Sequence, residues 1–260
     1  MTGTVTEDGF LGGRLRLRQP AHGFRAGMDT VMLAAAVPAR AGQSVLDLGC
    51  GVGTAALCLG ARVAGLDLAG VERDATAVAL ARDNSTRNAI ALEVIEADIA
   101  ALPPALRARR FNHVIANPPF HLAAGRDPAR DPAREAALSG TRPLATWLRT
   151  GRARLAPRGL LTMILAATRL GEALAVLEER RGAAEILPLA PRAGRAAHRV
   201  LIRWRQGSGA ELALWPPVVL HEGASHGTDA AHHAPAIEAV LRDGAALPWP
   251  GGGHRGDLRR

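Results

Sequence analysis

The sequence contains no lysine and no tyrosine, so all 32 basic residues are arginine and the aromatic residues are four Phe and four Trp. Without lysine, the chain cannot form a Schiff base with a carbonyl substrate. It also cannot build a phosphate-binding loop ending in Gly-Lys-Ser/Thr or supply the strand lysine of a protein kinase. These classes of enzyme are therefore excluded.

Cysteine is scarce, and long apolar runs are missing. Cys50 and Cys58 are the two cysteines, too few for a disulfide framework or a tetrahedral cysteine metal site. The first 13 residues lack the apolar core of a signal peptide, and apolar runs such as residues 160–167 are too short to span a membrane. We therefore expect a protein of the reducing cytoplasm without membrane-spanning segments.

The formal net charge is +8. A basic surface attracts phosphate, which favours nucleic-acid binding. A chain rich in Ala and Arg is, however, also what a GC-rich genome produces. The charge alone therefore leaves RNA binding open.

Short apolar runs alternate with helical patterns along most of the 260 residues. Strands are predicted at residues 44–48, 68–72, 92–97, 111–116, 160–166, 184–189 and 200–205. Helices are predicted to begin at Thr54 and to cover residues 75–84, with Asp74 as N-cap, and residues 169–180. This series predicts an α/β fold of the Rossmann-like type, an open and mostly parallel sheet with helices on both faces.

Three segments are less regular. Residues 11–20 are predicted to form a strand or hairpin with Arg14, Arg16 and Arg18 on one face, where they are candidate phosphate contacts. The repeat DPAR-DPAR at residues 126–134 is expected to be a loop. Beyond Gly207 we expect a short helix over residues 234–242 and a mobile end from Pro248.

A glycine loop, VLDLGCGVG at residues 45–53, follows the first predicted strand of the sheet. Gly49, Gly51 and Gly53 allow a sharp turn and the close approach of a ligand. A dinucleotide-binding loop would have its third glycine at position 54 and no acid like Asp47 near a pyrophosphate, so a nicotinamide oxidoreductase is the least favoured interpretation. The acid suits the cationic amino and sulfonium end of S-adenosylmethionine.

Two further carboxylates follow the next two strands. Glu72 can accept hydrogen bonds from ribose hydroxyls, and Asp98 can accept one from an adenine amino group. Each alone is ordinary for a strand end, but parallel strands bring their carboxyl ends to one edge. Together with Asp47 they predict a nucleoside-shaped site.

The fourth predicted strand ends in Asn117-Pro118-Pro119-Phe120. Proline ends strand pairing, but this does not explain the whole motif. The Asn117 side-chain carbonyl and the Pro118 backbone carbonyl can accept both N–H bonds of an exocyclic base amine, while Phe120 stacks on the base. These four residues are therefore the candidate catalytic residues.

These motifs, with GFRAGMDTVMLAAAV at residues 23–37 and HRVLI at residues 198–202, resemble the bacterial tRNA adenine-N6 methyltransferases that modify adenine 37 of a valine tRNA. The resemblance implies a seven-stranded methyltransferase sheet whose last strand is antiparallel. It implies that Asp47, Gly49, Gly51, Gly53, Glu72 and Asp98 hold S-adenosylmethionine. We expect three regions: an N-terminal strand or hairpin and helix capping the cofactor site (1–40), the methyltransferase domain (41–206) and a C-terminal extension with a short helix and a mobile tail (207–260).

The sequence predicts methyl transfer but leaves the molecule that accepts the methyl group open. Similar Asn-Pro-Pro-aromatic motifs occur in ribosomal-RNA guanine-N2 methyltransferases and in protein glutamine methyltransferases, and a non-catalytic RNA-binding protein is a third alternative. Many tRNA relatives carry tyrosine where Phe120 stands. The scattered histidines of the C-terminal region, His221, His226, His232, His233 and His254, match no metal-ligand spacing, so no metal is expected.

Overall fold

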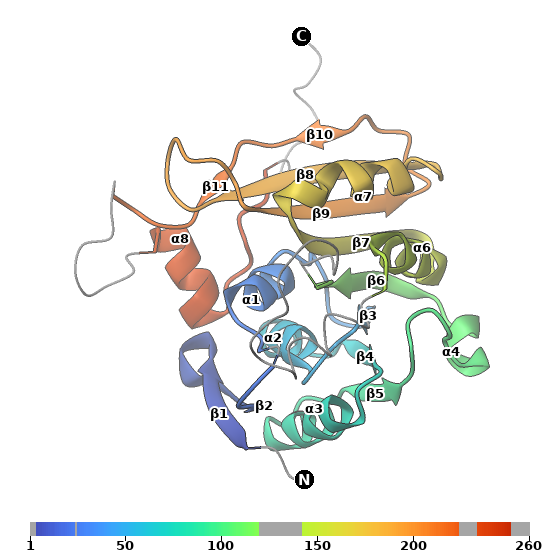
Figure 1. Cartoon of the computed structure of the whole chain (residues 1–260), viewed down its shortest axis with the longest axis vertical. Coiled ribbons are helices and arrows are strands. Elements are labelled where there is room, and N and C mark those ends of the chain that lie inside the picture. Colours follow the sequence, from blue (N-terminus) through green and yellow to red (C-terminus); the bar gives the residue numbers. More distant parts are fainter. Residues whose placement is uncertain (1–3, 24, 120–141, 224–232, 251–260) are drawn as a thin grey trace, which may run out of the picture.

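The computed structural model describes residues 4–23, 25–119, 142–223 and 233–250. In this part of the chain a central sheet is preceded by a separate β-hairpin and followed by a short C-terminal helical segment (Figure 1). The strands are β1 (Val5–Phe10), β2 (Leu15–Pro20), β3 (Ser44–Leu48), β4 (Asp67–Glu72), β5 (Glu93–Glu96), β6 (Phe111–Ala116), β7 (Leu155–Ala166), β8 (Gly182–Ala190), β9 (Arg199–Gln206), β10 (Ala213–Leu214) and β11 (Val218–Val219). The α-helices are α1 (Met28–Ala35), α2 (Thr54–Arg62), α3 (Ala75–Arg87), α4 (Pro104–Ala108), α6 (Leu144–Arg154), α7 (Leu170–Leu177) and α8 (Pro235–Glu238).

The sheet has the predicted Rossmann-like topology. Its strand order is β10-β8-β9-β7-β6-β3-β4-β5, with β11 also paired to β8. Strands β3 to β7 run parallel, whereas β9 is antiparallel to both β7 and β8. The seven long strands and the antiparallel last strand confirm the expectation, and the two-residue strands β10 and β11 are additions at the edge.

Helices cover both faces of the sheet, as the alternation of side chains along the strands requires. One core contains Val45, Ile115 and Ile164 from the sheet, together with apolar residues of α1, α2 and α3. The other contains the neighbouring Leu46 and Val114, together with apolar residues of α4, α6 and α7. The sheet is therefore buried on both sides, which explains its nearly continuous apolar strands.

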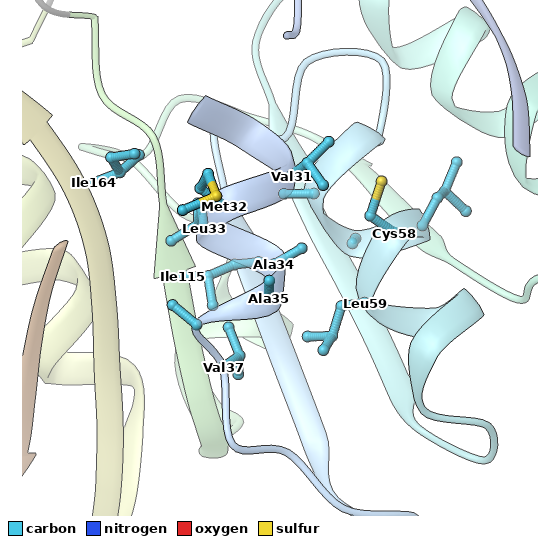
Figure 2. Close-up of a cluster of buried hydrophobic side chains, with 14 of the residues drawn as sticks. Val31, Met32, Leu33, Ala34, Ala35, Val37, Cys58, Leu59, Ile115 and Ile164 are labelled. Atoms are coloured by element: carbon cyan, nitrogen blue, oxygen red, sulfur yellow. The ribbon is translucent and has the colours of Figure 1, made fainter. Parts of the chain in front are cut away.

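Helix α1 packs across α2 and against the middle of the sheet (Figure 2). Its residues Met32 and Leu33 are fully buried, and they lie with Leu59 of α2 and Ile115 of β6 in one cluster. This packing fixes the N-terminal end of α1 beside the end of β6. That position becomes important for the candidate site.

The N-terminal hairpin differs from the prediction in two ways. Its first strand, β1, comes from residues that were not expected to be extended, and it pairs with β2 in antiparallel register from Val5 opposite Pro20 to Phe10 opposite Leu15. Arg14 lies outside β2, and its guanidinium donates to the backbone carbonyls of Asp243 (2.6 Å) and Ala61 (3.4 Å). Arg14 therefore joins distant segments instead of sharing an open strand face.

The C-terminal extension forms the predicted short helix, as α8 followed by the π-helical turn η3 (Ala239–Asp243). Of the end that we expected to be mobile, from Pro248, residues 251–260 lie outside the described residues, and the structure describes residues 248–250. Trp249 donates from Nε1 to Glu185 (2.6 Å), and the Arg203 guanidinium lies 3.6 Å from its ring centroid. Leu247 is buried in the same core as α1. Leu247 and Trp249 thus hold the end of the described chain against the core and the sheet.

Within the described ranges, no helix has both the length and the apolar character needed to cross a membrane.

Candidate functional site

The register of the sheet brings the predicted site residues to one edge. Leu48 pairs with both Val71 and Ala116, which are the last or next-to-last residues of their strands. The residues that follow them, Gly49, Glu72 and Asn117, therefore lie at one level along three adjacent strands. This is the carboxyl edge, where ligands bind in open α/β sheets.

The glycine loop has the backbone conformation that its composition predicts. Gly49, Gly51 and Gly53 have φ angles of 63°, 55° and 86°, in the left-handed region that disfavours other residues. A Cβ on Gly49 would come within 2.7 Å of Cζ3 of Trp147, which belongs to α6. The loop is therefore held against an indole ring that leaves space for glycine alone.

Glu72 is held firmly at the end of β4. One carboxylate oxygen accepts from the Gly51 backbone N–H (3.0 Å), and the other accepts from those of Arg73 (2.8 Å) and Asp74 (3.0 Å). Each carboxylate oxygen has more than one lone pair, so both can accept further bonds. Glu72 thereby joins the glycine loop to the start of α3, where Asp74 is the predicted N-cap and accepts from the Ala77 N–H.

Asp98 lies two residues beyond β5 and forms an ion pair that the sequence did not predict. Arg142 donates from Nη2 (2.5 Å) and Nε (3.1 Å) to Asp98 Oδ2, which holds the pKa of this carboxyl below its usual value. Asp98 Oδ1 also accepts from the Ala100 N–H (2.8 Å). The acid predicted to meet an adenine amino group is thus already engaged, although its oxygens retain acceptor capacity.

Asp47 lies beneath the edge and does not line the pocket described below. It is 2% exposed, and burial raises the pKa of its carboxyl to about 8, with Glu72 adding to this effect and the Ala56 N–H opposing it. Its Oδ2 has no hydrogen-bond partner in the described structure. Asp47 is therefore a buried acid behind the glycine loop.

Asn117 follows β6 with one half of its side-chain amide engaged. Its Nδ2 donates to Thr30 Oγ1 of α1 at 3.3 Å. Its Oδ1 is buried and has no hydrogen-bond partner within the described residues. A buried acceptor without a partner costs free energy, so this oxygen is an unfilled acceptor position at the sheet edge.

The two prolines continue the chain along the same edge. Pro118 is buried, and the Pro119 carbonyl accepts from the Arg169 guanidinium at 3.4 Å. Arg169, which is itself paired with Glu172, closes the short 3₁₀ turn η2 (Ala167–Arg169) after β7. Phe120, the fourth predicted catalytic residue, and the DPAR repeat lie outside the described residues.

One pocket collects six of the ten predicted site residues, namely Gly49, Gly51, Glu72, Asp98, Asn117 and Pro119. Its remaining lining residues were not predicted, and they are Val71, Arg73, Ala97, Ile99, Arg142 and Trp147. The helical spacing of the apolar residues around Trp147 could have indicated α6, the helix that contributes Trp147 to the pocket lining. No lining residue in the described part comes from residues 1–40; α1 instead reaches the site through Thr30.

Two histidines of the C-terminal region lie together, away from this pocket. The rings of His221 and His233 stack with centroids 4.8 Å apart, and His233 Nδ1 lies 3.2 Å from Glu238. The other three, His226, His232 and His254, lie outside the described residues. Among the residues that the structure describes, no group of three or more His, Cys, Asp or Glu side chains could hold a metal ion.

Comparison with known proteins gives sequence relatives over most of the chain. A family model named "Methyltransferase small domain" matches residues 25–137. A tRNA1(Val) (adenine(37)-N6)-methyltransferase of Dickeya chrysanthemi is 31% identical over 193 residues, covering 73% of this chain and 76% of that protein. The enzyme of the same name from Serratia proteamaculans is 32% identical over 186 residues, covering 69% and 70%.

Solved structures show the same fold. A protein of Agrobacterium tumefaciens described as a predicted O-methyltransferase superposes with a TM-score of 0.67 at 28% identity, covering 84% of this chain and 97% of that one. A 16S rRNA N2 methyltransferase from T. thermophilus, in complex with AdoMet and guanosine, gives 0.55 at 23% identity, covering 78% and 50%. The sheet described above is thus a methyltransferase fold.

Proposed function

Because the chain belongs to the family of the tRNA1(Val) (adenine(37)-N6)-methyltransferases, we propose that it methylates N6 of an adenine in tRNA, with adenine 37 of a valine tRNA as the target. The observation that carries the proposal is the unpartnered Asn117 Oδ1, a buried acceptor beside the pocket at the sheet edge. An exocyclic amine supplies the hydrogen that this oxygen lacks.

The residues of the pocket fit S-adenosylmethionine. The glycine loop lets a ligand approach its backbone closely, because Gly49 carries no side chain and Trp147 leaves no room for one. Glu72 presents a carboxylate that is fixed by three backbone N–H groups. In this proposal Glu72 accepts from the ribose hydroxyls and Asp98 from the adenine amino group. Bound S-adenosylmethionine supplies a methyl group made electrophilic by its sulfonium.

The acceptor side of the site orients the nucleophile. The nitrogen of an adenine amino group is a weak nucleophile because its lone pair is delocalised into the ring. Asn117 Oδ1 and the Pro118 carbonyl accept its two N–H bonds and favour a pyramidal nitrogen directed toward the methyl group. The proton leaves after positive charge has developed, so these preorganised acceptors replace a strong base. A base in RNA reaches this position by turning out of its stack.

The burial of Asp47 supports an indirect role. Its carboxyl lies behind the glycine loop and not in the pocket wall, and its pKa of about 8 leaves it largely uncharged at neutral pH, so in this proposal it acts through the loop that it supports. Residues 41–206 then hold the cofactor, while residues 1–40 contribute Thr30 on the acceptor side.

The acceptor is tested by transfer of tritiated methyl groups from S-adenosylmethionine to total RNA and to total protein in parallel. We expect label in RNA, recovered as N6-methyladenosine after nucleoside digestion, and no label with Asn117→Ala. Label recovered as N2-methylguanosine would identify guanine as the acceptor, and label recovered in protein glutamine would identify protein as the acceptor. Either result would refute the proposal of an adenine acceptor. An absence of both transfer and cofactor binding would favour a non-catalytic RNA-binding protein.

The tRNA position is tested by mass spectrometry of valine tRNA from a strain that lacks the gene. We expect adenine 37 to be unmethylated in the deletion strain and methylated after complementation. Unchanged methylation at that position would refute the tRNA assignment while leaving the reaction class untouched.

A further inference from the structure

The loop that joins β8 to β9, residues 191–198, lies on the acceptor side of the site. Strand β8 runs in the same direction as β7, so the loop leaves the sheet at its carboxyl edge. The His198 carbonyl accepts from the Ala167 N–H at 3.0 Å, and Arg169, two residues further, donates to the Pro119 carbonyl. A short chain of contacts therefore connects this loop to the Asn-Pro-Pro motif.

The loop is shaped by its own contacts. The Arg195 N–H donates to the Arg192 carbonyl (3.1 Å), closing a turn in which Gly194 has a φ of 71°. The Arg192 guanidinium donates to the backbone carbonyls of Glu222 (2.6 Å) and Gly223 (2.8 Å). Arg192 is thus used to anchor the loop to the segment that follows β11.

Two side chains of the loop remain available. Arg195 and His198 are exposed, and neither side chain has a hydrogen bond or an ion pair within the described residues. Of the acids beside the loop, Asp29 pairs with Arg199 (2.9 Å) and Glu172 with Arg169 (2.9 Å), whereas the exposed carboxylate of Glu222 has no ion pair among the described residues. Arg192 and Arg195 outweigh this single charge, so the loop presents net positive charge on the acceptor side of the site.

We propose that residues 191–198 form a docking surface for RNA, with Arg195 binding a phosphate that flanks the target nucleotide and His198 adding a second donor. This inference rests on the proposed function, because it requires an RNA acceptor. A nucleotide turned into the site draws its flanking phosphates across the neighbouring sheet edge. Phosphate contacts of this kind set position and affinity without reading the sequence.

The arginines of the hairpin fit this role less well. Arg16 pairs with Glu7 (3.5 Å) and Arg18 with Asp83 (3.3 Å). The backbone N–H of Arg16 donates to Oδ1 of Asn88. Asn88 lies one residue beyond the C-terminal end of α3, whereas Glu72 lies just before its N-terminal end. The 13 residues of α3 place that end about 20 Å from the candidate site.

The test compares Arg195→Gln with Arg180→Gln. Arg180 is also an exposed arginine, in the turn before β8 at the opposite edge of the sheet, and its loss changes the net charge by the same amount. Binding of transcribed valine tRNA is measured at several salt concentrations, together with the kinetics of methyl transfer and the affinity for S-adenosylmethionine.

For Arg195→Gln we expect the slope of log Kd against the logarithm of the salt concentration to decrease by the amount that about one phosphate contact contributes. This corresponds to about fourfold weaker tRNA binding at 0.15 M salt. We expect KM for tRNA to rise by a similar factor, with kcat at saturating tRNA and the cofactor affinity unchanged. Arg195→Lys should keep the wild-type salt dependence, and Arg180→Gln should match wild type.

Equal salt dependence in Arg195→Gln and wild type would overturn the inference, as would equal effects of Arg195→Gln and Arg180→Gln. Weaker cofactor binding in Arg195→Gln would also overturn it. A failure of the proposed function is seen separately, because the wild-type protein would then transfer no methyl group to RNA.

Discussion

The hydrogen bond from Asn117 to Thr30 gives a sharp prediction about how the acceptor amide is oriented. With Nδ2 held by the Thr30 hydroxyl, Oδ1 is left without a partner, as the acceptor that the proposed reaction requires for the target amine. The change Thr30→Val removes the hydroxyl and keeps the branched shape of a side chain that is 6% exposed. The amide is then free to turn its N–H groups toward the amine, which it would repel.

The size of the effect follows from the bond that is lost. A neutral hydrogen bond contributes about 1 kcal/mol, and the 3.3 Å separation gives no reason to expect more. If this energy serves to orient Asn117 in the transition state, kcat falls about fivefold. The affinity for S-adenosylmethionine should not change, because α1 contributes no residue to the described pocket wall.

The assay measures kcat at saturating tRNA and cofactor, and cofactor Kd by calorimetry, for wild type, Thr30→Val and Thr30→Ser. Thr30→Ser keeps the hydroxyl and loses a buried methyl group, so it should retain kcat while unfolding somewhat more easily. Equal losses of kcat in both variants would show that Thr30 acts through packing. Wild-type kcat in Thr30→Val would refute the role of this hydrogen bond.

Three further predictions concern the cofactor side. Glu72→Gln should weaken S-adenosylmethionine binding about tenfold or more in calorimetry, because its amide N–H₂ opposes the backbone donors and one ribose acceptor is lost; unchanged affinity would contradict its role. Gly49→Ala should abolish measurable cofactor binding and lower the melting temperature, because the new Cβ collides with Trp147 and the residue has a left-handed φ. A wild-type melting temperature and wild-type cofactor affinity in this variant would count against the packing argument. Burial raises the pKa of Asp47 from 3.8 to about 8, so between about pH 4 and pH 8 the folded protein holds one proton more than the unfolded chain. The free energy of unfolding therefore falls as the pH rises through this range, by up to about 1.4 kcal/mol per pH unit. Urea unfolding at pH 5 and pH 8 should show a smaller decrease for Asp47→Asn than for wild type, and identical decreases would refute the assignment.

The strands were predicted well where the sequence marks their ends. The expected bounds of β3 and β6 coincide with those observed, because a glycine loop follows one and Asn-Pro-Pro the other. Strand β7 begins at Leu155, earlier than expected, since Pro157 and Arg158 interrupt its apolar pattern and the pairing with β6 shifts register there. Local pattern thus located the strands but not this irregular start.

The site was predicted as far as it is a property of strand ends. Glu72 and Asn117 follow from the rule that parallel strands meet at their carboxyl edge. Thr30 and Trp147 reach the site from α1 and α6, and Arg142 reaches it from just before α6, so their contacts depend on how whole helices pack against the sheet. The apolar spacing around Trp147 indicates a helix, but no local spacing indicates where that helix packs. The correction to Arg14 has the same origin, since its carbonyl partners belong to distant segments.

The two acceptors at the end of β6 also bear on how the enzyme would release its product. In the proposed reaction an adenine amino group offers two hydrogens, one for Asn117 Oδ1 and one for the Pro118 carbonyl, whereas the methylated amine keeps one. The product therefore leaves one acceptor unfilled again, which weakens its binding by roughly the net 0.5–1.5 kcal/mol of one hydrogen bond. A buried oxygen without a partner, costly to the resting protein, would thus favour substrate over product and help each turnover to end.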